Sequence, residues 1–567
     1  MIDPMKSNER FTRGEAYFIE PFFTNLDKNV FAAKYLPSEV LGALASRYSR
    51  STKGVRRLFY DEYIKPIIEP NLEGADKKSI REAESMSKEL IAFVDYLHEH
   101  GGWEAVVNSR RARDFFRKWL AAYGDDSIAQ MAGAHIFFEN ISNVATKILE
   151  DFRIGFAPLE KSTRYVLFDQ KVGGRYLYFL EPDIVKSKYG RQYIALTNML
   201  FRRYTDSIEP LSLYLQKKFS QEADQSDRAY RETIKAKACD VLRSYLPAAT
   251  LTNVGFFGVG QALEYVLTKC YTHPLAEIRQ LAKSAQIELD KVIPSLVDRT
   301  TSARGKIYQK YVASTEKRLE RLTKKLLGTS ALRDVKSGPV DLVEWDRDAE
   351  DKIVASILYK YANIGYRAIK DQVSKMSAKQ KLAVIKSVVS GRQVRQHRLI
   401  RAFENTYYKF DLMLNLGAYR DLHRHRMLTS ERQRFTTELG FDIPHDLVDS
   451  RMNKPYSDAA MQIDKFYRKL AKTMPDAAQY VVMMGHRIRW YQWENLRELA
   501  WEAELRTGPQ GHPDYRVIEQ LKVEAVRCVH PMLVEALKFV DFAKYDLARR
   551  ESEKRIDRKL GLSGVNP

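Results

Sequence analysis

The sequence has little of what marks secreted, zinc-binding or membrane proteins. Only three of its 567 residues are cysteines, and Cys239, Cys270 and Cys528 lie far apart with no CxxC pair. This usage is typical of a reducing, cytosolic setting and predicts no metal site. No apolar run reaches the roughly 18 residues that a membrane span needs, and the N-terminus lacks a signal-peptide pattern. We therefore expect a cytoplasmic protein that does not enter a membrane.

The common catalytic signatures are also absent. The sequence contains no GxxxxGK[ST] phosphate loop, no HExxH, no GxSxG and no clustered cysteine or histidine ligands. Gly258 and Gly260 do not begin a dinucleotide fingerprint, because Leu263 stands where the third glycine would be. The sequence thus identifies no catalytic nucleophile. Cofactor chemistry remains compatible with this, since a cofactor carries the hard steps and the protein positions it.

Length and composition indicate a folded protein of two or more domains. Hydrophobic residues make up 44% of the chain and aromatic residues 11%. The formal net charge of +20 favours polyanionic partners such as phosphorylated small molecules or nucleic acid. Basic residues are dispersed over several runs, at 53–57, 110–113, 317–325, 392–401 and 549–559. Such dispersion is more typical of a solvated surface than of one nucleic-acid groove, so nucleic-acid binding stays an alternative.

The densest group of chemically useful residues surrounds His423-Arg424-His425-Arg426. Five arginines and two histidines lie between Arg420 and Arg434. An arginine fork matches a phosphate or carboxylate with paired hydrogen bonds and keeps its charge. We expect a histidine between two arginines to be neutral near pH 7. The group predicts a site for a phosphorylated or electron-rich planar ligand; the alternative is an exposed basic patch at a helix end.

Arg424-His425-Arg426 resembles the Arg-His-Arg core of the flavin-dependent thymidylate synthases, which binds flavin in that family. In the family a serine and an Arg-Tyr pair follow the core. Here Arg434 stands where the serine would be, and the nearest arginine-aromatic pair is Arg434-Phe435. The resemblance implies that Arg424, His425 and Arg426 bind FAD.

The missing end of that motif occurs about 270 residues earlier in the chain. Ser162-Thr163-Arg164-Tyr165 resembles the family's Ser-x-Arg-Tyr, and the resemblance implies that Ser162, Arg164 and Tyr165 bind the nucleotide. The position of Arg-His-Arg, however, holds Asp151-Phe152-Arg153, where an aspartate would repel a phosphate. Each copy therefore keeps a different part of one motif, which indicates an internal duplication.

A later stretch of the second copy resembles the family's Asn-x-Arg followed by arginine nine residues on. By this resemblance Asn495 and Arg497 serve flavin, and Arg506 serves the nucleotide. Eleven helical residues at about 100° each bring Arg506 to within about 20° of Asn495, while Arg497 points elsewhere. The alternative is a solvated pair of Glu502 and Arg506 at i,i+4 spacing.

Periodicity predicts mostly helices. Apolar positions at helical spacing predict one helix over 38–48 and another from Ile128 to about residue 150. The predicted segments are a first repeat at 1–295, a basic helical linker at 296–344, a second repeat at 345–545 and a charged tail at 546–567. The resemblance implies an α+β fold of two fused thymidylate-synthase-like repeats. Each repeat would be an antiparallel sheet flanked by long helices, and the whole chain would be helix-rich.

The resemblance also implies an activity: reductive methylation of dUMP to dTMP with FAD, using NADPH and methylenetetrahydrofolate as co-substrates. Family members build each site from more than one chain of a homotetramer, so a fused duplicate predicts a homo-oligomer, a dimer of tandem chains. We expect the two repeats to complement each other, the first on the nucleotide side and the second on the flavin side. The alternatives are flavin-dependent modification of another pyrimidine or of nucleic acid, and a decayed paralogue that only binds nucleotides or nucleic acid.

Overall fold

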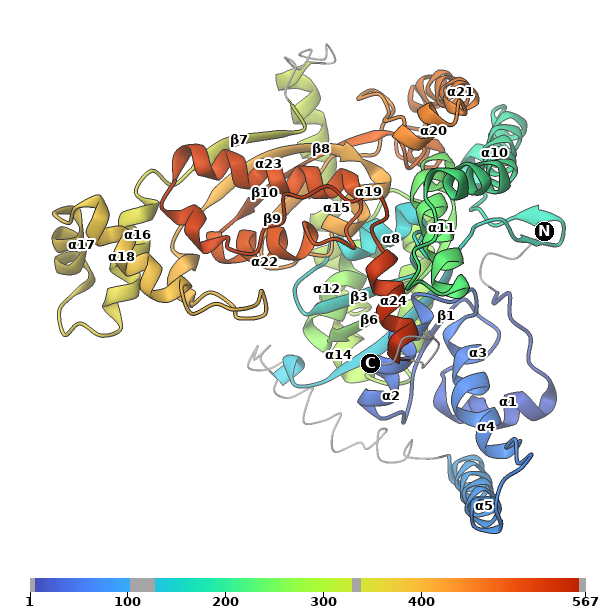
Figure 1. The fold of residues 1–567 in the computed structure, drawn as a ribbon. Coiled ribbons are helices and arrows are strands. Elements are labelled where there is room, and N and C mark those ends of the chain that lie inside the picture. The colour runs from blue at the N-terminus through green and yellow to red at the C-terminus, as the bar shows by residue number, and fades with distance from the viewer. Residues whose placement is uncertain (1–5, 102–127, 329–337, 560–567) are drawn as a thin grey trace. The chain divides into compact units, whose positions relative to one another are not determined.

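The structure, a computed structural model, describes residues 6–101, 128–328 and 338–559 (Figure 1). The chain divides into two compact units. The first comprises residues 1–197 and 248–332, and the second comprises residues 198–247 and 333–567. Each unit is built around one four-stranded antiparallel sheet with helices packed against it. The predicted fold class, two α+β repeats in a helix-rich chain, is confirmed.

The two sheets have the same topology. The first runs in the order β1-β2-β6-β3, and the second in the order β7-β8-β10-β9, so the fourth strand in sequence lies between the second and third in both. This shared order is the structural mark of the duplication. The strands are β1 (Val30–Ala32), β2 (Gly133–Ser142), β3 (Phe156–Glu160), β6 (Leu251–Val259), β7 (Val340–Trp345), β8 (Tyr408–Asn415), β9 (Thr429–Arg432) and β10 (Arg487–Glu494).

Helices follow equivalent strands in both repeats. The second strand leads into α8 or α19, and the fourth into the pair α12–α13 or α22–α23. Figure 1 shows α22 and α23 lying along the second sheet, and α23 contacts β7 and β8. The bounds are α8 (Asn143–Glu150), α12 (Gly260–Tyr271), α13 (Ala276–Leu289), α19 (Leu416–Leu422), α22 (Leu496–Arg506) and α23 (Pro513–Val529).

One polar contact recurs in both repeats and fixes their register. The side chains of Ser142 and Asn415 cap α8 and α19 by accepting a hydrogen bond from the backbone three residues on, each at 2.9 Å. A carboxylate from the first turn of α13 or α23 then holds the cap. Glu277 accepts from the Ser142 hydroxyl at 2.7 Å, and Asp514 accepts from the Asn415 amide at 2.6 Å.

The core of the second sheet is apolar along β8 but not along β10. In β8 the alternating buried positions are occupied by Tyr408, Phe410, Leu412 and Leu414, and Asn415 at the strand end is the helix cap. Alternate residues of β10 are also buried, yet the last two of them are Gln492 and Glu494. Because side chains on a strand alternate between its faces, both polar groups point into the core. The sheet therefore ends in a buried polar site.

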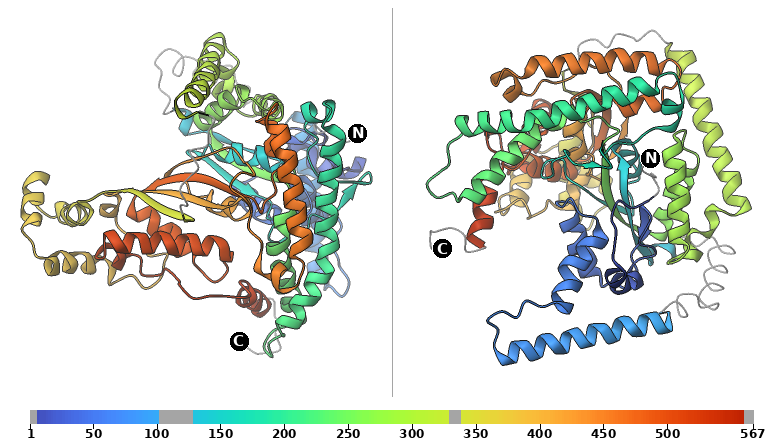
Figure 2. Two further views of the ribbon diagram at one scale, coloured as in Figure 1. Left: turned by 90° about the horizontal axis from the view of Figure 1, so that it is seen from above. Right: turned by 90° about the vertical axis from the view of Figure 1, so that its right-hand side faces the viewer.

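A segment from the first half of the sequence belongs to the second unit. It contains most of α10 (Gly190–Lys218) and all of α11 (Asp227–Leu242). Lys218 and Lys237 pair with Asp446 at 3.1 and 2.9 Å. Figure 2 shows α10 running beside α21 (Asn453–Ala471) in both views. The first half of the sequence thus contributes a helical segment to the second unit.

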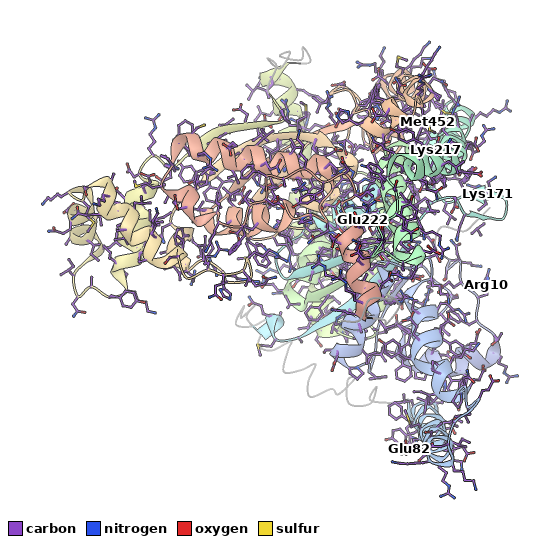
Figure 3. The ribbon with its side chains drawn as sticks, viewed as in Figure 1. Arg10, Glu82, Lys171, Lys217, Glu222 and Met452 are labelled. Atoms are coloured by element: carbon purple, nitrogen blue, oxygen red, sulfur yellow. The ribbon has the colours of Figure 1, made fainter. Side chains whose placement is uncertain are left out.

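The C-terminal helix α24 (Arg550–Lys559) is fixed by ion pairs to this contributed segment. Glu222, labelled in Figure 3, accepts hydrogen bonds from Arg550 and Lys554. Arg228 donates to Asp557 at 2.6 Å. The predicted charged tail is therefore a packed helix over these residues.

The helix predicted over 38–48 is confirmed, and α2 spans Ser38–Tyr48. The helix predicted from Ile128 to about residue 150 is wrong, because residues 133–142 form β2 and only α8 is helical. Adjacent side chains of β2, Ile136, Phe137 and Phe138, are all buried. A strand covered on both faces loses the alternation that distinguishes it from a helix in sequence.

The basic helix α15 (Ala303–Leu327) lies within the predicted linker, and β7 already belongs to the second sheet. Among the described residues, none of the helices combines the length and the hydropathy that crossing a membrane requires.

Replacing Asn415 tests the recurring cap. We expect Asn415→Ala to lower the free energy of unfolding by about 1–2 kcal/mol, because the cap is lost and Asp514 loses its donor. Asn415→Ser keeps a capping oxygen, as Ser142 does in the first repeat, and should lower it by clearly less. Denaturant unfolding monitored by circular dichroism measures both. Equal losses in the two variants would contradict the cap.

Candidate functional site

One cavity of about 690 Å³ in the second unit gathers most of the residues predicted from sequence. It lies between α22, the loop that follows α19, and the connecting segment at 392–404. Of the nine predicted site residues, six line it: Arg424, His425, Arg426, Asn495, Arg497 and Arg506. The lining contains eight arginines and three glutamates, an excess of five positive charges. Such a cavity selects an anionic ligand.

The loop carrying Arg424, His425 and Arg426 is short and held at both ends. It begins where α19, a helix buried along almost its whole length, ends at Leu422. It ends two residues before β9, which pairs with β10 in the sheet. His425 donates its backbone N–H to Leu422 O at 3.2 Å. A rigid scaffold therefore sets the direction of these side chains.

His425 is the buried member of this group, 5% exposed, whereas Arg426 is exposed. The Nε2 atom of His425 accepts a hydrogen bond from Arg506 Nε at 2.9 Å. Since arginine is always protonated, Nε2 must offer a lone pair, and the proton of the neutral ring lies on Nδ1. Glu498 Oε1 lies 3.4 Å from Nδ1. The ring is therefore held between a donor and an acceptor in one tautomer.

Asn495 and Arg497 contact the protein at the start of α22. The Asn495 side chain accepts from Glu498 N at 2.9 Å and so caps α22. Arg497 donates to Leu399 O at 2.7 Å and pairs with Glu404 at 2.8 Å. Arg506, one helix length away, turns toward His425 as described above. The predicted solvated pair of Glu502 and Arg506 is wrong, because Glu502 is fully buried.

The connecting segment at 392–404 adds cavity residues that sequence reasoning missed. Arg392 forms a bidentate pair with Glu504 at 2.9 and 2.6 Å and also donates to Ala536 O. Arg395 and Arg398 lie over the Trp501 ring, with the Arg398 guanidinium 4.4 Å from its centre. In the sequence, an arginine stands at every third position of the run 392–401. This spacing is the signal that could have indicated cavity residues, but the run resembles dispersed surface charge.

Beneath the cavity lies a set of buried charges, here called the buried Glu–Lys cluster: Glu494, Glu502, Glu519 and Lys522, all less than 2% exposed. Lys522 Nζ lies 2.8 Å from Glu494, 3.0 Å from Glu502 and 3.2 Å from Glu519. Glu502 also accepts a hydrogen bond from Gln492. Its other oxygen lies 4.0 Å from His425 Nε2, so the cluster reaches the cavity lining.

The pKa values of the three glutamates in the cluster are shifted in different directions. Burial raises the pKa of Glu494 well above its usual range. Burial and the neighbouring Glu502 raise the pKa of Glu519 to about 8. Burial also disfavours the charge on Glu502, but Lys522 outweighs it and lowers the pKa of Glu502 to about 2. Burial therefore disfavours charge on Glu494 and Glu519, while Lys522 favours the charged form of Glu502.

The three remaining predicted residues, Ser162, Arg164 and Tyr165, lie in the first unit just after β3. Ser162 N donates to Ser49 O at 2.9 Å, and Arg164 is buried. Tyr165 is exposed, with the Arg50 guanidinium 5.4 Å from its ring centre. Their roles in binding stay predictions.

Among the described residues, no group of three histidine, cysteine, aspartate or glutamate side chains is arranged to hold a metal ion. The cavity offers cationic and aromatic groups instead.

The raised pKa of Glu519 predicts a pH-dependent stability. Its folded-state pKa of about 8 exceeds the ordinary 4.5, so its stabilising contribution is complete below about pH 4.5 and is lost as pH rises through about 8. Glu519→Gln cannot lose this proton. Between about pH 5 and about pH 8 the wild type should lose up to about 1.4 kcal/mol per pH unit relative to the variant. Thermal unfolding across pH measures this, and parallel curves would contradict it.

Comparison with known proteins identifies the family. Residues 48–295 and 341–532 match the Thy1 family model, described as thymidylate synthase complementing protein. The UPF0159 protein of Chlamydia pneumoniae is 37% identical over 550 residues, which cover 96% of this chain and 98% of that protein. The UPF0159 protein Ta1429 of Thermoplasma acidophilum is 30% identical over 479 residues, covering 80% and 94%.

Among solved structures, the UMP/dUMP methylase PolB from Streptomyces cacaoi bound with 5-Br dUMP is 17% identical and has a TM-score of 0.29. It covers 35% of this chain and 93% of its own, a similarity too low to carry an argument. The family match covers most of the chain in two blocks, one in each repeat, and includes every predicted site residue. The chain therefore belongs to the Thy1 family of thymidylate synthase complementing proteins.

Proposed function

We propose that this protein is a flavin-dependent thymidylate synthase, which methylates dUMP reductively to dTMP with methylenetetrahydrofolate and NADPH as co-substrates. Family membership supports this activity. The observation that carries the proposal is the convergence of Arg424, His425, Arg426, Asn495, Arg497 and Arg506 on one cationic cavity. The Arg-His-Arg loop and the start of α22 are about 70 residues apart in sequence, so only the fold brings them into one cavity.

The cavity residues suit FAD. The cavity volume, about 690 Å³, falls in the range of small-molecule sites, about 300–1,000 Å³. Its arginines match the pyrophosphate, because a guanidinium fork binds phosphate oxygens in pairs. Trp501 offers an aromatic face for a planar ring. When bound, the flavin supplies the redox chemistry that reductive methylation requires and that no side chain provides.

The protein's own residues would bind and orient the reactants. Arg424 and Arg426 project from a rigid loop and would hold phosphate groups, while Arg506 would contact the nucleotide. Arg497 is kept at the cavity wall by Glu404 and Leu399 O, which fixes its guanidinium before any ligand arrives. Such preorganised donors stabilise negative charge as it develops on the uracil oxygens.

We further propose that the first unit supplies the nucleotide side through Ser162, Arg164 and Tyr165. The support is that each repeat lacks what the other keeps: Asp151 and Phe152 replace the Arg-His of the first repeat, and Arg434 replaces the serine of the second. The shared strand order of the two sheets makes one chain equivalent to two fused copies. Two such chains, a homodimer, would then replace a homotetramer.

Removing a cavity arginine tests the flavin site. We expect purified protein to be yellow, and Arg426→Ala to bind added FAD about 10–100-fold more weakly, the loss of one or two charged hydrogen bonds. Arg434→Ala is the matched control, because Arg434 pairs with Asp476 at 3.0 Å and is not among the cavity-lining residues. Flavin fluorescence titration measures both affinities. Equal affinity for the two variants would contradict the site.

The contribution of the first unit has its own test. Arg164→Ala should keep the flavin but lose the change in the flavin absorption spectrum that dUMP produces in the wild type. Arg191→Ala, an exposed arginine on α10, is the control. A dUMP response that survives unchanged in Arg164→Ala would contradict complementation while leaving the flavin site intact.

A second candidate is favoured by the net charge of +20, which exceeds what a mononucleotide needs. It is flavin-dependent modification of a pyrimidine within nucleic acid. Binding to single-stranded DNA or RNA that weakens steeply with salt, together with no response to dUMP, would select this activity over thymidylate synthesis.

A further inference from the structure

Comparison of the two repeats shows that the fold does not require charge at the positions of the buried Glu–Lys cluster. Counting from the equivalent helix starts, the first repeat has apolar or small residues at all four cluster positions: Gly258 for Glu494, Val266 for Glu502, Ala282 for Glu519 and Ala285 for Lys522. The shared contacts of Glu277 and Asp514 with the helix caps support this register. The first repeat buries other charges, such as Lys147 with Glu150 and Glu160, but its sheet and helices form without charge at these four positions.

The first repeat lacks both the cluster and the equivalent cavity residues. Where the second repeat has His425 and Arg506, the first has Phe152 and Cys270. Burying several charges costs free energy, and apolar replacement of a buried ionic group is often neutral or stabilising. A group that the fold does not need, and that is found in the repeat with the cationic cavity, points to a role in the cavity.

The geometry shows which residues the cluster acts on. Glu502 Oε2 is held by Lys522 and Gln492, and this leaves Oε1 4.0 Å from His425 Nε2. Arg506 follows Glu502 by one helical turn and donates to the same His425 nitrogen. Glu502 therefore faces the hydrogen bond by which Arg506 of α22 contacts the Arg-His-Arg loop.

The surroundings of Glu502 are defined from every side. β10 contributes Gln492 and Glu494, α22 contributes Glu498 and Arg506, α23 contributes Glu519 and Lys522, and the loop after α19 contributes His425. From β8, the Phe410 ring lies 5.4 Å from the Lys522 ammonium.

We propose that the buried Glu–Lys cluster is a positioning device for the cavity, in which Glu502 holds Arg506 and His425 in the orientation that receives the ligand. Lys522 fixes Glu502, and Glu494 and Glu519 complete its shell. Glu502 is thus a positioning residue that acts through its two neighbours. The lowered pKa of Glu502 supports this role, because it keeps a negative charge under Arg506 across the physiological range.

The first test replaces Glu502 with its neutral isostere. In Glu502→Gln the charge under Arg506 is lost, so the hydrogen bond to His425 Nε2 should weaken and the ring should no longer keep one tautomer. Selective ¹⁵N-histidine labelling of the full chain, with the His425 signals assigned from His425→Gln, reports the tautomer directly. We expect the wild type to show a single Nδ1–H form and the variant to show a mixture.

The second measurement is the affinity for FAD, which rests on the proposed function. Glu502→Gln should bind FAD at least about 10-fold more weakly. Asp446→Asn is the matched control: it removes another buried carboxylate of the second unit, held by Lys218 and Lys237, away from the cavity lining. It should leave both the tautomer and the FAD affinity unchanged.

A third, fourfold variant copies the first repeat with Glu494→Gly, Glu502→Val, Glu519→Ala and Lys522→Ala together. We expect its melting temperature to equal or exceed that of the wild type, while its FAD affinity falls as in Glu502→Gln. This separates positioning from folding. If Glu502→Gln or the fourfold variant keeps the wild-type His425 spectrum, or if the fourfold variant unfolds at a markedly lower temperature, the proposal is overturned.

The two failures can be told apart. Wild-type protein that binds no FAD contradicts the proposed function, but the His425 spectrum still tests the positioning role. FAD binding with an unchanged His425 spectrum in Glu502→Gln contradicts only the positioning role.

Discussion

The hydrogen bond from Arg506 to His425 joins the two parts of the cavity. One part is the Arg-His-Arg loop after α19, and the other is the last turn of α22. An arginine can only donate, so this bond sets the histidine tautomer, and Glu498 on the other side of the ring completes it. The bond is supported from below by buried charge rather than by apolar packing. The shape of the cationic cavity therefore depends on a polar floor.

Within one chain, the duplication separates what the fold requires from what the site requires. Both repeats keep the strand order, the capped helix after the second strand and the carboxylate that holds the cap. Only the second has the Arg-His-Arg loop and the charges beneath it. Its β10 strand carries glutamine and glutamate into the core where the equivalent strand, β6, carries phenylalanine and glycine. Charge at these core positions is thus found in the repeat with the cavity and not at the equivalent positions of the other repeat.

Sequence reasoning predicted the duplication, the fold class and six residues of one cavity because each left a local signal. The Arg-His-Arg triplet and the Asn-x-Arg spacing needed no knowledge of tertiary contacts. It failed at β2, where burial of both faces hid the strand. It also missed Glu494, Glu502, Glu519 and Lys522, because a glutamate that is buried by another element has the same spacing in sequence as one on a solvated helix. The segment 198–247 could not be assigned to the second unit for the same reason: only tertiary contacts reveal it.

The central claim is that one intact flavin cavity exists in each chain, formed around the second repeat. Its most direct test is the stoichiometry of FAD bound to the purified full-length protein, measured by saturating titration and removal of excess flavin. We expect one flavin per chain, since Asp151 and Phe152 stand in place of the Arg-His pair at the equivalent position of the first repeat. Two flavins per chain, or none, would contradict it.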